Sequence, residues 1–270
     1  MSGVIVLRQM LLERWRSLLA WTVSIAALML VMLVFYPSIR DSGADFDAWI
    51  QSLPESARQT FGLAEASMTT PIGYLVSQVY SNIYPLVVII MTFSLAGWAI
   101  AGCEADGTLE TTLSAPLRRW VLGLARFVGI ALAALAVIAI STGVLALSSP
   151  FFDLDVGVPG WGVWAAGLTM WGLVMVYTAA VFAVGAATGR RTWALAAGSA
   201  LAVIGFLGQV FASLAEPLEF LQTISPWYWF LGGDPLTEAP GWTSLALPVS
   251  LAVVVAGIGI AVFERRDLAV

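Results

Sequence analysis

The chain is 270 residues long, and 60% of its residues are hydrophobic whereas only 11% are charged. Soluble domains are about 45–50% apolar and about 25% charged, so this composition indicates an integral membrane protein without a separate soluble domain. The formal net charge is −5, and every cation is an arginine because the sequence contains no lysine and no histidine. Without lysine there is no Walker A motif, so any ATP that drives this chain must be bound by another one. The absence of histidine removes the commonest general base and metal ligand, and we expect neither a catalytic nor a metal site.

Residues 1–16 predict an amphipathic helix that lies in the membrane interface. Its apolar face is formed by Val4, Leu7, Leu11 and Trp15. The apolar run that follows is longer than the hydrophobic region of a signal peptide, and no small-residue cleavage site comes after it. We therefore expect residues 17–36 to form the first span, with the N-terminus in the cytoplasm.

The acidic segment 37–71 separates this span from the next and is predicted to be extracellular, with short amphipathic helices. Thr70 and Pro71 form a typical helix start, so we expect a second span over residues 72–102. Polar side chains recur in the outer half of this span at helical spacing: Tyr74, Gln78, Ser81 and Asn82. They either line a translocation path or hydrogen-bond to a neighbouring helix.

Four further spans are predicted over residues 118–147, 161–188, 193–215 and 242–263. Trp171 lies near the middle of the fourth span, where it either contacts substrate or packs in the core. Segment 216–241 is predicted to be extracellular and contains a short aromatic helix, with Ser225 as its cap, Pro226 as its first residue and glycines at its end. This helix is too short to span, so we expect it at the outer interface.

Arginine distribution orients these spans. With six spans and both termini in the cytoplasm, ten of the twelve arginines face the cytoplasm. The opposite orientation would place the same ten outside, against the positive-inside rule. We therefore expect an all-α polytopic membrane protein with six transmembrane helices and cytoplasmic N and C termini.

Residues 103–117 form a charged segment that joins the second and third spans. Such a segment cannot lie in hydrocarbon, so it must sit in cytoplasmic water. Asp106 and Gly107 suit the opening of a short helix with Glu110 near its positive end, and Ser114 suits a second cap before Pro116. Arg126 lies just inside the next span and either reaches the headgroups or pairs with an acid such as Glu104. Cys103 is expected to pack rather than react.

The spacing of Glu104, Gly107-Thr108, Glu110, Leu113, Ser114, Pro116 and Arg119 resembles the cytoplasmic loop of ABC-2 type transporter permeases. The closing segment from Phe263 to Asp267 is a second, weaker match. In that family this loop is the coupling helix that rests on the ATPase subunit, and the N-terminal helix flanks the contact. The resemblance assigns ATPase coupling to Glu104, Asp106, Gly107, Thr108, Glu110, Leu113, Pro116, Arg118 and Arg119.

The same resemblance implies the partners and the location. Two ABC ATPase subunits would bind ATP and Mg, a second permease subunit, identical or different, would complete the pore, and this chain would bind no cofactor. The chain would contact membrane lipid and no nucleic acid, in the plasma (inner) membrane of a prokaryote.

The spans are nearly free of carboxylates, and no cluster has the spacing of a catalytic site, so energy must enter from outside the bilayer. We therefore expect the permease subunit of an ATP-driven exporter that moves a hydrophobic or amphipathic substrate, such as a drug, lipid or peptide antibiotic, out of the cell. Two alternatives stay open: an ion-coupled secondary transporter that uses the polar stripe of the second span, and a non-transporting scaffold or sensor subunit.

Overall fold

The computed structural model describes residues 3–42, 52–54, 70–114, 117–154, 157–212, 224–232 and 235–267, which form helices and connections and no strand. Within these residues, six helical segments are long and apolar enough to cross a membrane. They are Gly3–Asp41, Pro71–Ala105, Arg119–Phe152, Gly162–Thr188, Arg191–Gln209 and Trp242–Arg265. This confirms the predicted all-α fold with six spans. Most of the predicted extracellular segment 37–71, residues 216–223 and 233–234 of segment 216–241, and residues 115–116 lie outside the described residues.

The first helix, α1 (Gly3–Asp41), is continuous for 39 residues. No helix boundary separates the predicted interfacial segment 1–16 from the span that follows it, so the two are parts of one element. The physical reason is local, since neither glycine nor proline occurs between Gly3 and Pro37 to end the helix. At 1.5 Å per residue α1 is about 58 Å long and exceeds a hydrocarbon core of about 30 Å, so its ends project from the membrane.

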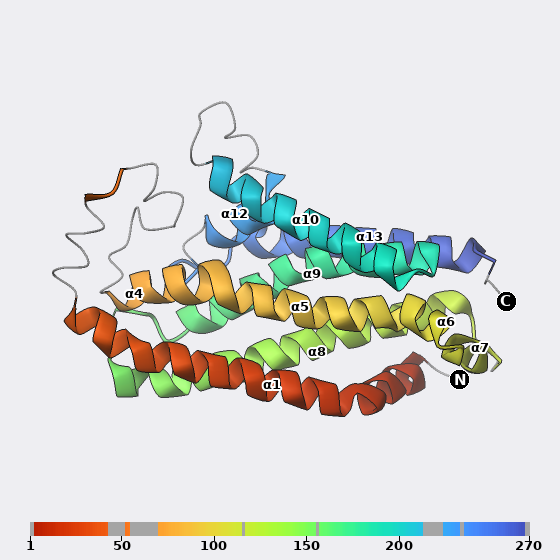
Figure 1. Ribbon diagram of the computed structural model, residues 1–270, viewed down its shortest axis with the longest axis horizontal. Helices are drawn as coiled ribbons and strands as arrows, with labels where there is room; N and C mark the ends of the chain where they lie inside the picture. Colours follow the sequence, from red (N-terminus) through yellow and green to blue (C-terminus); the bar gives the residue numbers. More distant parts are fainter. Residues whose placement is uncertain are drawn as a thin grey trace.

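The bundle is built around α9 (Gly162–Thr188). This helix is buried along most of its length and packs against α5 (Tyr84–Gly97), α8 (Arg119–Ser148), α10 (Arg191–Ala212) and α13 (Leu247–Arg265). Figure 1 shows α1 on the opposite side of the bundle from α10 and α13, where it lies along α8. The outer helices expose large apolar side chains, as a lipid-facing surface requires: Leu19, Val23, Val34, Leu201, Ile204, Val253 and Ile258.

Two of the spans contain a π-helix, whose turns are wider than those of an α-helix, and in both a proline follows it. The second span begins with α4 (Pro71–Tyr74), where the Thr70 hydroxyl accepts a hydrogen bond from the Gly73 N–H at 3.2 Å, which confirms the predicted cap. The span continues through the π-helix η1 (Leu75–Ile83) into α5, whose second residue is Pro85. The last span repeats this arrangement, with the π-helix η5 (Trp242–Ala246) directly before Pro248 in α13. Proline donates no N–H to the preceding turn, so the helix widens there.

The short aromatic helix forms as predicted, as α12 (Pro226–Leu231), but its cap and its surroundings differ. The Ser225 hydroxyl does not cap the helix; it donates to the Gly205 carbonyl of α10 at 3.0 Å. Trp227 and Phe230 are each 1% exposed, and they pack edge to face against Phe206 and Tyr80, respectively. The helix is therefore anchored in the bundle by its aromatic side chains and does not rest on it from outside.

Two glycines of α13 test the contact between α13 and α9. A Cβ on Gly259 would lie 2.5 Å from the Ala183 Cα, whereas a Cβ on Gly257 would meet nothing within 4 Å. We expect Gly259→Ala to destabilise the protein by about 1–3 kcal/mol, the usual effect of overpacking a core. Gly257→Ala is the matched control and should be neutral or slightly stabilising, because alanine favours helix. Thermal unfolding of both variants in detergent is the measurement, and equal unfolding temperatures would contradict the expectation.

Candidate functional site

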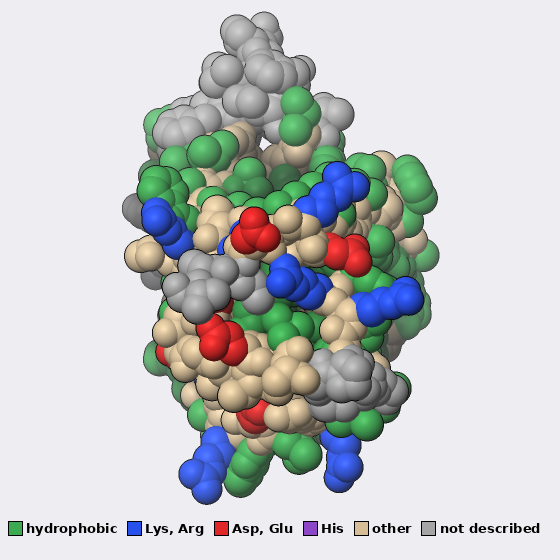
Figure 2. Space-filling view, turned by 90° about the vertical axis from the view of Figure 1, so that its right-hand side faces the viewer, with side chains coloured by type: hydrophobic (Ala, Val, Ile, Leu, Met, Phe, Trp, Pro, Cys, Tyr) green, Lys and Arg blue, Asp and Glu red, His purple; other side chains and the backbone are tan. Residues whose placement is uncertain are grey.

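Both chain termini and the connection between the second and third spans lie at one end of the bundle (Figure 1). Figure 2 looks onto this end and shows arginine and acidic side chains gathered across it. It is also the end that the arginine distribution assigns to the cytoplasm. The residues predicted to couple to an ATPase therefore share a face with the ends of α1, α8 and α13.

The connection consists of two short helices with a tight turn between them. The first, α6 (Cys103–Ala105), ends at Asp106, and Gly107 takes a left-handed conformation with φ +69° before α7 (Thr108–Leu113) begins. Leu109 is 1% exposed and anchors α7 in the core. The Thr108 hydroxyl donates to the Cys103 carbonyl at 3.2 Å and ties α7 to the end of the span. Cys103 is buried, in agreement with its predicted packing role.

The predicted coupling residues fall into two groups. The exposed group comprises Asp106, Gly107, Thr108, Glu110 and Arg118, and Glu110 lies in the first turn of α7, where the helix dipole favours an acid. The second group faces inward: Leu113 packs against the core, and Glu104 and Arg119 are half-buried and bound to other parts of the chain. Pro116 lies outside the described residues. The first group alone presents side chains to a partner.

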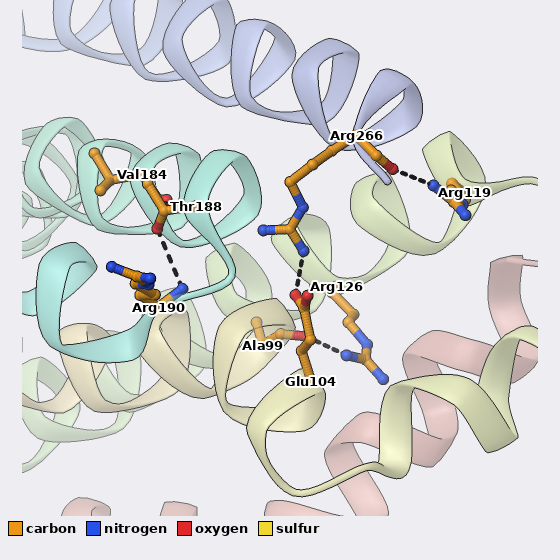
Figure 3. Close-up of polar contacts among 8 residues, drawn as sticks. All are labelled: Ala99, Glu104, Arg119, Arg126, Val184, Thr188, Arg190 and Arg266. Atoms are coloured by element: carbon orange, nitrogen blue, oxygen red, sulfur yellow. Dashed lines mark hydrogen bonds and ion pairs between the residues drawn. The ribbon is translucent and has the colours of Figure 1, made fainter. Parts of the chain in front are cut away.

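Glu104 forms an ion pair with Arg266, at the end of α13 (Figure 3). The same arginine is bound a second time through its backbone, since Arg119 Nη1 donates to the Arg266 carbonyl at 2.6 Å. The Glu104 and Arg266 side chains are only 14% and 16% exposed, so solvent screens their attraction less than at an open surface. We call these three residues, Glu104, Arg119 and Arg266, the cytoplasmic clamp.

Arg126 is not the partner of Glu104, contrary to one of the two predictions for it. It is 6% exposed, so its side chain does not extend to the surface of the bundle as the other prediction required. It donates to the carbonyl of Ala99, within the π-helix η2 (Trp98–Gly102) (Figure 3). The π-helix η2 interrupts the regular α-helical hydrogen bonds of the backbone, and the Arg126 guanidinium donates to a carbonyl at that point.

The turn between α9 and α10 closes over the clamp. Gly189 ends α9 with φ +67°, and its N–H donates to the Gly185 carbonyl at 2.9 Å. A Cβ on Gly189 would lie 2.6 Å from Glu104 Oε2 and 2.5 Å from Arg266 Nη1. Glycine is needed here for its conformation and for its lack of a side chain. The clamp therefore joins three spans, through α6 at the end of the second, α8 and the end of α13, and the α9–α10 turn packs against it.

The candidate path residues have partners inside the chain. The Tyr74 hydroxyl donates to the Met32 carbonyl of α1 at 2.5 Å, and the Trp171 indole N–H donates to the Ala131 carbonyl of α8 at 3.0 Å. The Asn82 amide donates to the Ser77 carbonyl at 2.9 Å. Gln78 also has an interaction, and Ser81 is half-buried. Tyr74 and Trp171 therefore bond to neighbouring helices and Asn82 bonds within its own span, and a role of these residues in a path stays a prediction.

A sequence profile described as ABC-2 family transporter protein matches residues 5–268. The chain belongs to the ABC-2 transporter family. This confirms the resemblance drawn from the loop after the second span, and the match extends over nearly the whole chain. The protein is therefore a multi-pass permease subunit of an ABC transporter, a class that works with ABC ATPase subunits and carries no ATPase site of its own. A search of curated proteins finds no match.

Sequence reasoning missed three residues of this site in the permease. Leu109 follows the predicted helix start and is the one apolar residue in the first turn of α7, so amphipathicity would have found it. Arg266 was noted within the closing segment, but nothing local tied it to Glu104, which is 162 residues away. Gly189 lies next to Arg190 and Arg191 in the chain, and its contact with the ion pair has no signal in the sequence.

Proposed function

We propose that the permease exports a hydrophobic or amphipathic substrate from the cytoplasmic side, driven by two ABC ATPase subunits that bind ATP and Mg. A second permease subunit, identical or different, completes the transporter in the plasma membrane of a prokaryote. The observation that carries the proposal is the arrangement of α6 and α7, which exposes acids and a hydroxyl to a partner while its inward side is bound to other spans.

The coupling step follows from this arrangement. ATP binding closes the ATPase pair, and the motion displaces α7 through its exposed residues Asp106, Thr108 and Glu110. Leu109 and the Thr108–Cys103 hydrogen bond make α7 move with α6. The clamp then transmits the displacement to α8 and α13. A ligand shifts an equilibrium only by its differential affinity for the two states, so the work comes from tighter ATP binding in one arrangement.

The lipid-facing and interior surfaces support an apolar cargo. No Asp or Glu occurs within residues 17–36, 72–102, 120–147, 161–188, 193–212 or 242–263. Coupling ions commonly need ionisable groups near the midplane, so this pattern favours an external energy source over an ion gradient. Cargo such as a drug, lipid or peptide antibiotic would enter from the inner leaflet.

Reversing the charge of Glu110 tests the docking surface. We expect Glu110→Arg to lower ATP hydrolysis by the purified permease–ATPase complex, and co-purification of the ATPase, by about tenfold, which equals a loss of about 1.4 kcal/mol in binding free energy. Glu238→Arg is the matched control, because Glu238 is exposed at the opposite end of the bundle.

Thermal unfolding should change little in both variants, by no more than about 1 kcal/mol from the α7 dipole, since Glu110 makes no ion pair within the described residues. Wild-type coupling in the Glu110→Arg complex would refute docking through α7. Export that stops on dissipation of ion gradients while ATP persists would instead indicate a secondary transporter, and a complex that binds ATPase but moves no substrate would indicate a scaffold.

A further inference from the structure

A cavity of about 160 Å³ lies at the cytoplasmic end, between the first turns of α1 and the α6–α7 connection. Its wall includes both apolar and polar side chains. The apolar part contains Val6, Met10, Trp98 and Cys103. The polar part contains Gln9, Glu13, Asp106, Thr108, Thr112 and Arg126. The cavity does not include the clamp, Glu110 or Arg118, but it shares Asp106 and Thr108 with the exposed coupling group.

Arg126 is the one cation in the cavity wall, and its charge is not neutralised. Its guanidinium has five N–H donors, of which one binds the Ala99 carbonyl. Within the described residues no carboxylate lies within ion-pair distance of it. Buried charges are normally paired, and a guanidinium facing a cavity with free donors suits the oxygens of a phosphate.

A second guanidinium approaches the same wall. Arg14 of α1 lies over the Trp98 ring at 3.9 Å from its centroid, and Arg126 lies 5.7 Å from that centroid. Arg14, like Arg126, has no carboxylate within ion-pair distance in the described part of the chain. The indole thus lies between α1 and α8 with an arginine from each, and the two positive charges reinforce attraction for an anion.

Two acids stand beside these cations. Glu13 and Asp106 line the cavity and are exposed, and the Glu13 carboxylate accepts a hydrogen bond from the Gln9 amide at 3.1 Å. An anion alone would be repelled by both carboxylates. A group that carries a phosphate and an ammonium together would satisfy the arginines and the acids at once.

The cavity adjoins an apolar hollow on the outer side of α1. This hollow is lined by Ile5, Arg8, Gln9, Leu12 and Glu13, and it shares Gln9 and Glu13 with the cavity. Leu12 is 58% exposed, and the same face of α1 continues toward the span with Leu19 and Val23, which are 55% and 59% exposed. A polar cavity at headgroup depth that continues into an apolar surface has the shape of a phospholipid site.

We propose that this cavity binds the headgroup of an inner-leaflet phospholipid that carries both phosphate and ammonium, of the phosphatidylethanolamine class. Arg126 faces the phosphate and Arg14, over the Trp98 ring, adds positive charge nearby, Glu13 and Asp106 face the ammonium, and the acyl chains run from Leu12 toward Leu19 and the span. The bound lipid lies between α1 and the α6–α7 connection, next to the surface that couples to the ATPase.

Lipid titration of the delipidated permease–ATPase complex, followed by native mass spectrometry, tests this proposal. Phosphatidylethanolamine and phosphatidylglycerol with the same acyl chains are compared. We expect one preferred phosphatidylethanolamine per permease chain, bound about fivefold or more tightly than phosphatidylglycerol, and about tenfold weaker binding in Arg126→Gln. Arg190→Gln removes an exposed arginine at the same end of the bundle and should bind lipid as the wild type does.

If Arg126→Gln fails to fold because Arg126 is buried, the variant Glu13→Gln still tests the proposal. Glu13 is exposed, and its replacement should abolish the preference for phosphatidylethanolamine while phosphatidylglycerol still binds, a change that general destabilisation does not produce. Equal binding of both lipids by the wild type, unchanged binding in Arg126→Gln, or an unchanged preference in Glu13→Gln would overturn the proposal. Binding of soluble phosphoethanolamine in the absence of any bound lipid would overturn it too, since the ligand would then be a free phosphate ester.

Discussion

Replacing Glu104 with glutamine is expected to destabilise the permease by about 2–3 kcal/mol, because the half-buried guanidinium of Arg266 loses its carboxylate. A fully buried pair would lose more, and the 14–16% exposure of these side chains reduces the effect. Thermal and chemical unfolding in detergent measure it. Glu264→Gln is the control, since Glu264 is an exposed acid near the end of the same helix as Arg266, α13.

The double variant separates the pair from the rest of the clamp. Arg266→Gln alone should destabilise the protein by a similar amount, and Glu104→Gln combined with Arg266→Gln should cost clearly less than the sum, because neither charge is then left alone. The Arg119 bond to the Arg266 backbone survives in all three variants. Strictly additive losses would show that the ion pair contributes nothing to stability.

Gly189→Ala is expected to have the second large effect, and Gly107→Ala provides a closely matched control. Both glycines have left-handed backbones, with φ +67° and +69°, so alanine strains each by about 1–2 kcal/mol. Only Gly189 lies against the clamp; a Cβ on Gly107 would meet nothing within 4 Å. Gly189→Ala must also push Glu104 and Arg266 apart.

We therefore expect Gly189→Ala to lower stability by at least about 1 kcal/mol more than Gly107→Ala, in line with the effect of overpacking. Unfolding of the two variants side by side gives the difference. In the Glu104→Gln, Arg266→Gln background the difference should shrink, because the rigid ion pair is gone. Equal losses in the two glycine variants would mean that the α9–α10 turn does not press on the clamp.

The residues that stabilise this permease are different from the exposed ones predicted to couple it to the ATPase, so a variant can lose one property and keep the other. Glu104 and Arg119 are bound to other parts of the chain, whereas Glu110 is exposed and forms no ion pair within the described residues. Variants of Glu104 and Arg119 should unfold more easily whether or not an ATPase is present. Variants of Glu110 should mainly change the interaction with the ATPase.

Most of the fold could be predicted from the sequence, since apolar length identifies spans and caps identify helix starts. Thr70 and Pro71 begin the second span, and Pro226 begins α12, as expected from local chemistry. No helix boundary separates residues 1–16 from the first span, because amphipathicity changes along α1 while the backbone there contains no residue that would end the helix. The role of Ser225 was also misassigned, because its hydroxyl has a better acceptor on α10 than on its own helix.

The order of apolar and charged residues by itself determined that this chain crosses the membrane six times and carries a short helix on a charged connection. Helix periodicity and span length are local properties, so a single sequence reports them. Only the tertiary structure decided which charges meet. Glu104 pairs with Arg266 because packing around α9 brings the end of α13 next to α6. Arg126 instead donates to the Ala99 carbonyl in the π-helix η2. Contacts between residues that lie far apart in the chain depend on how helices pack, and no local pattern encodes them.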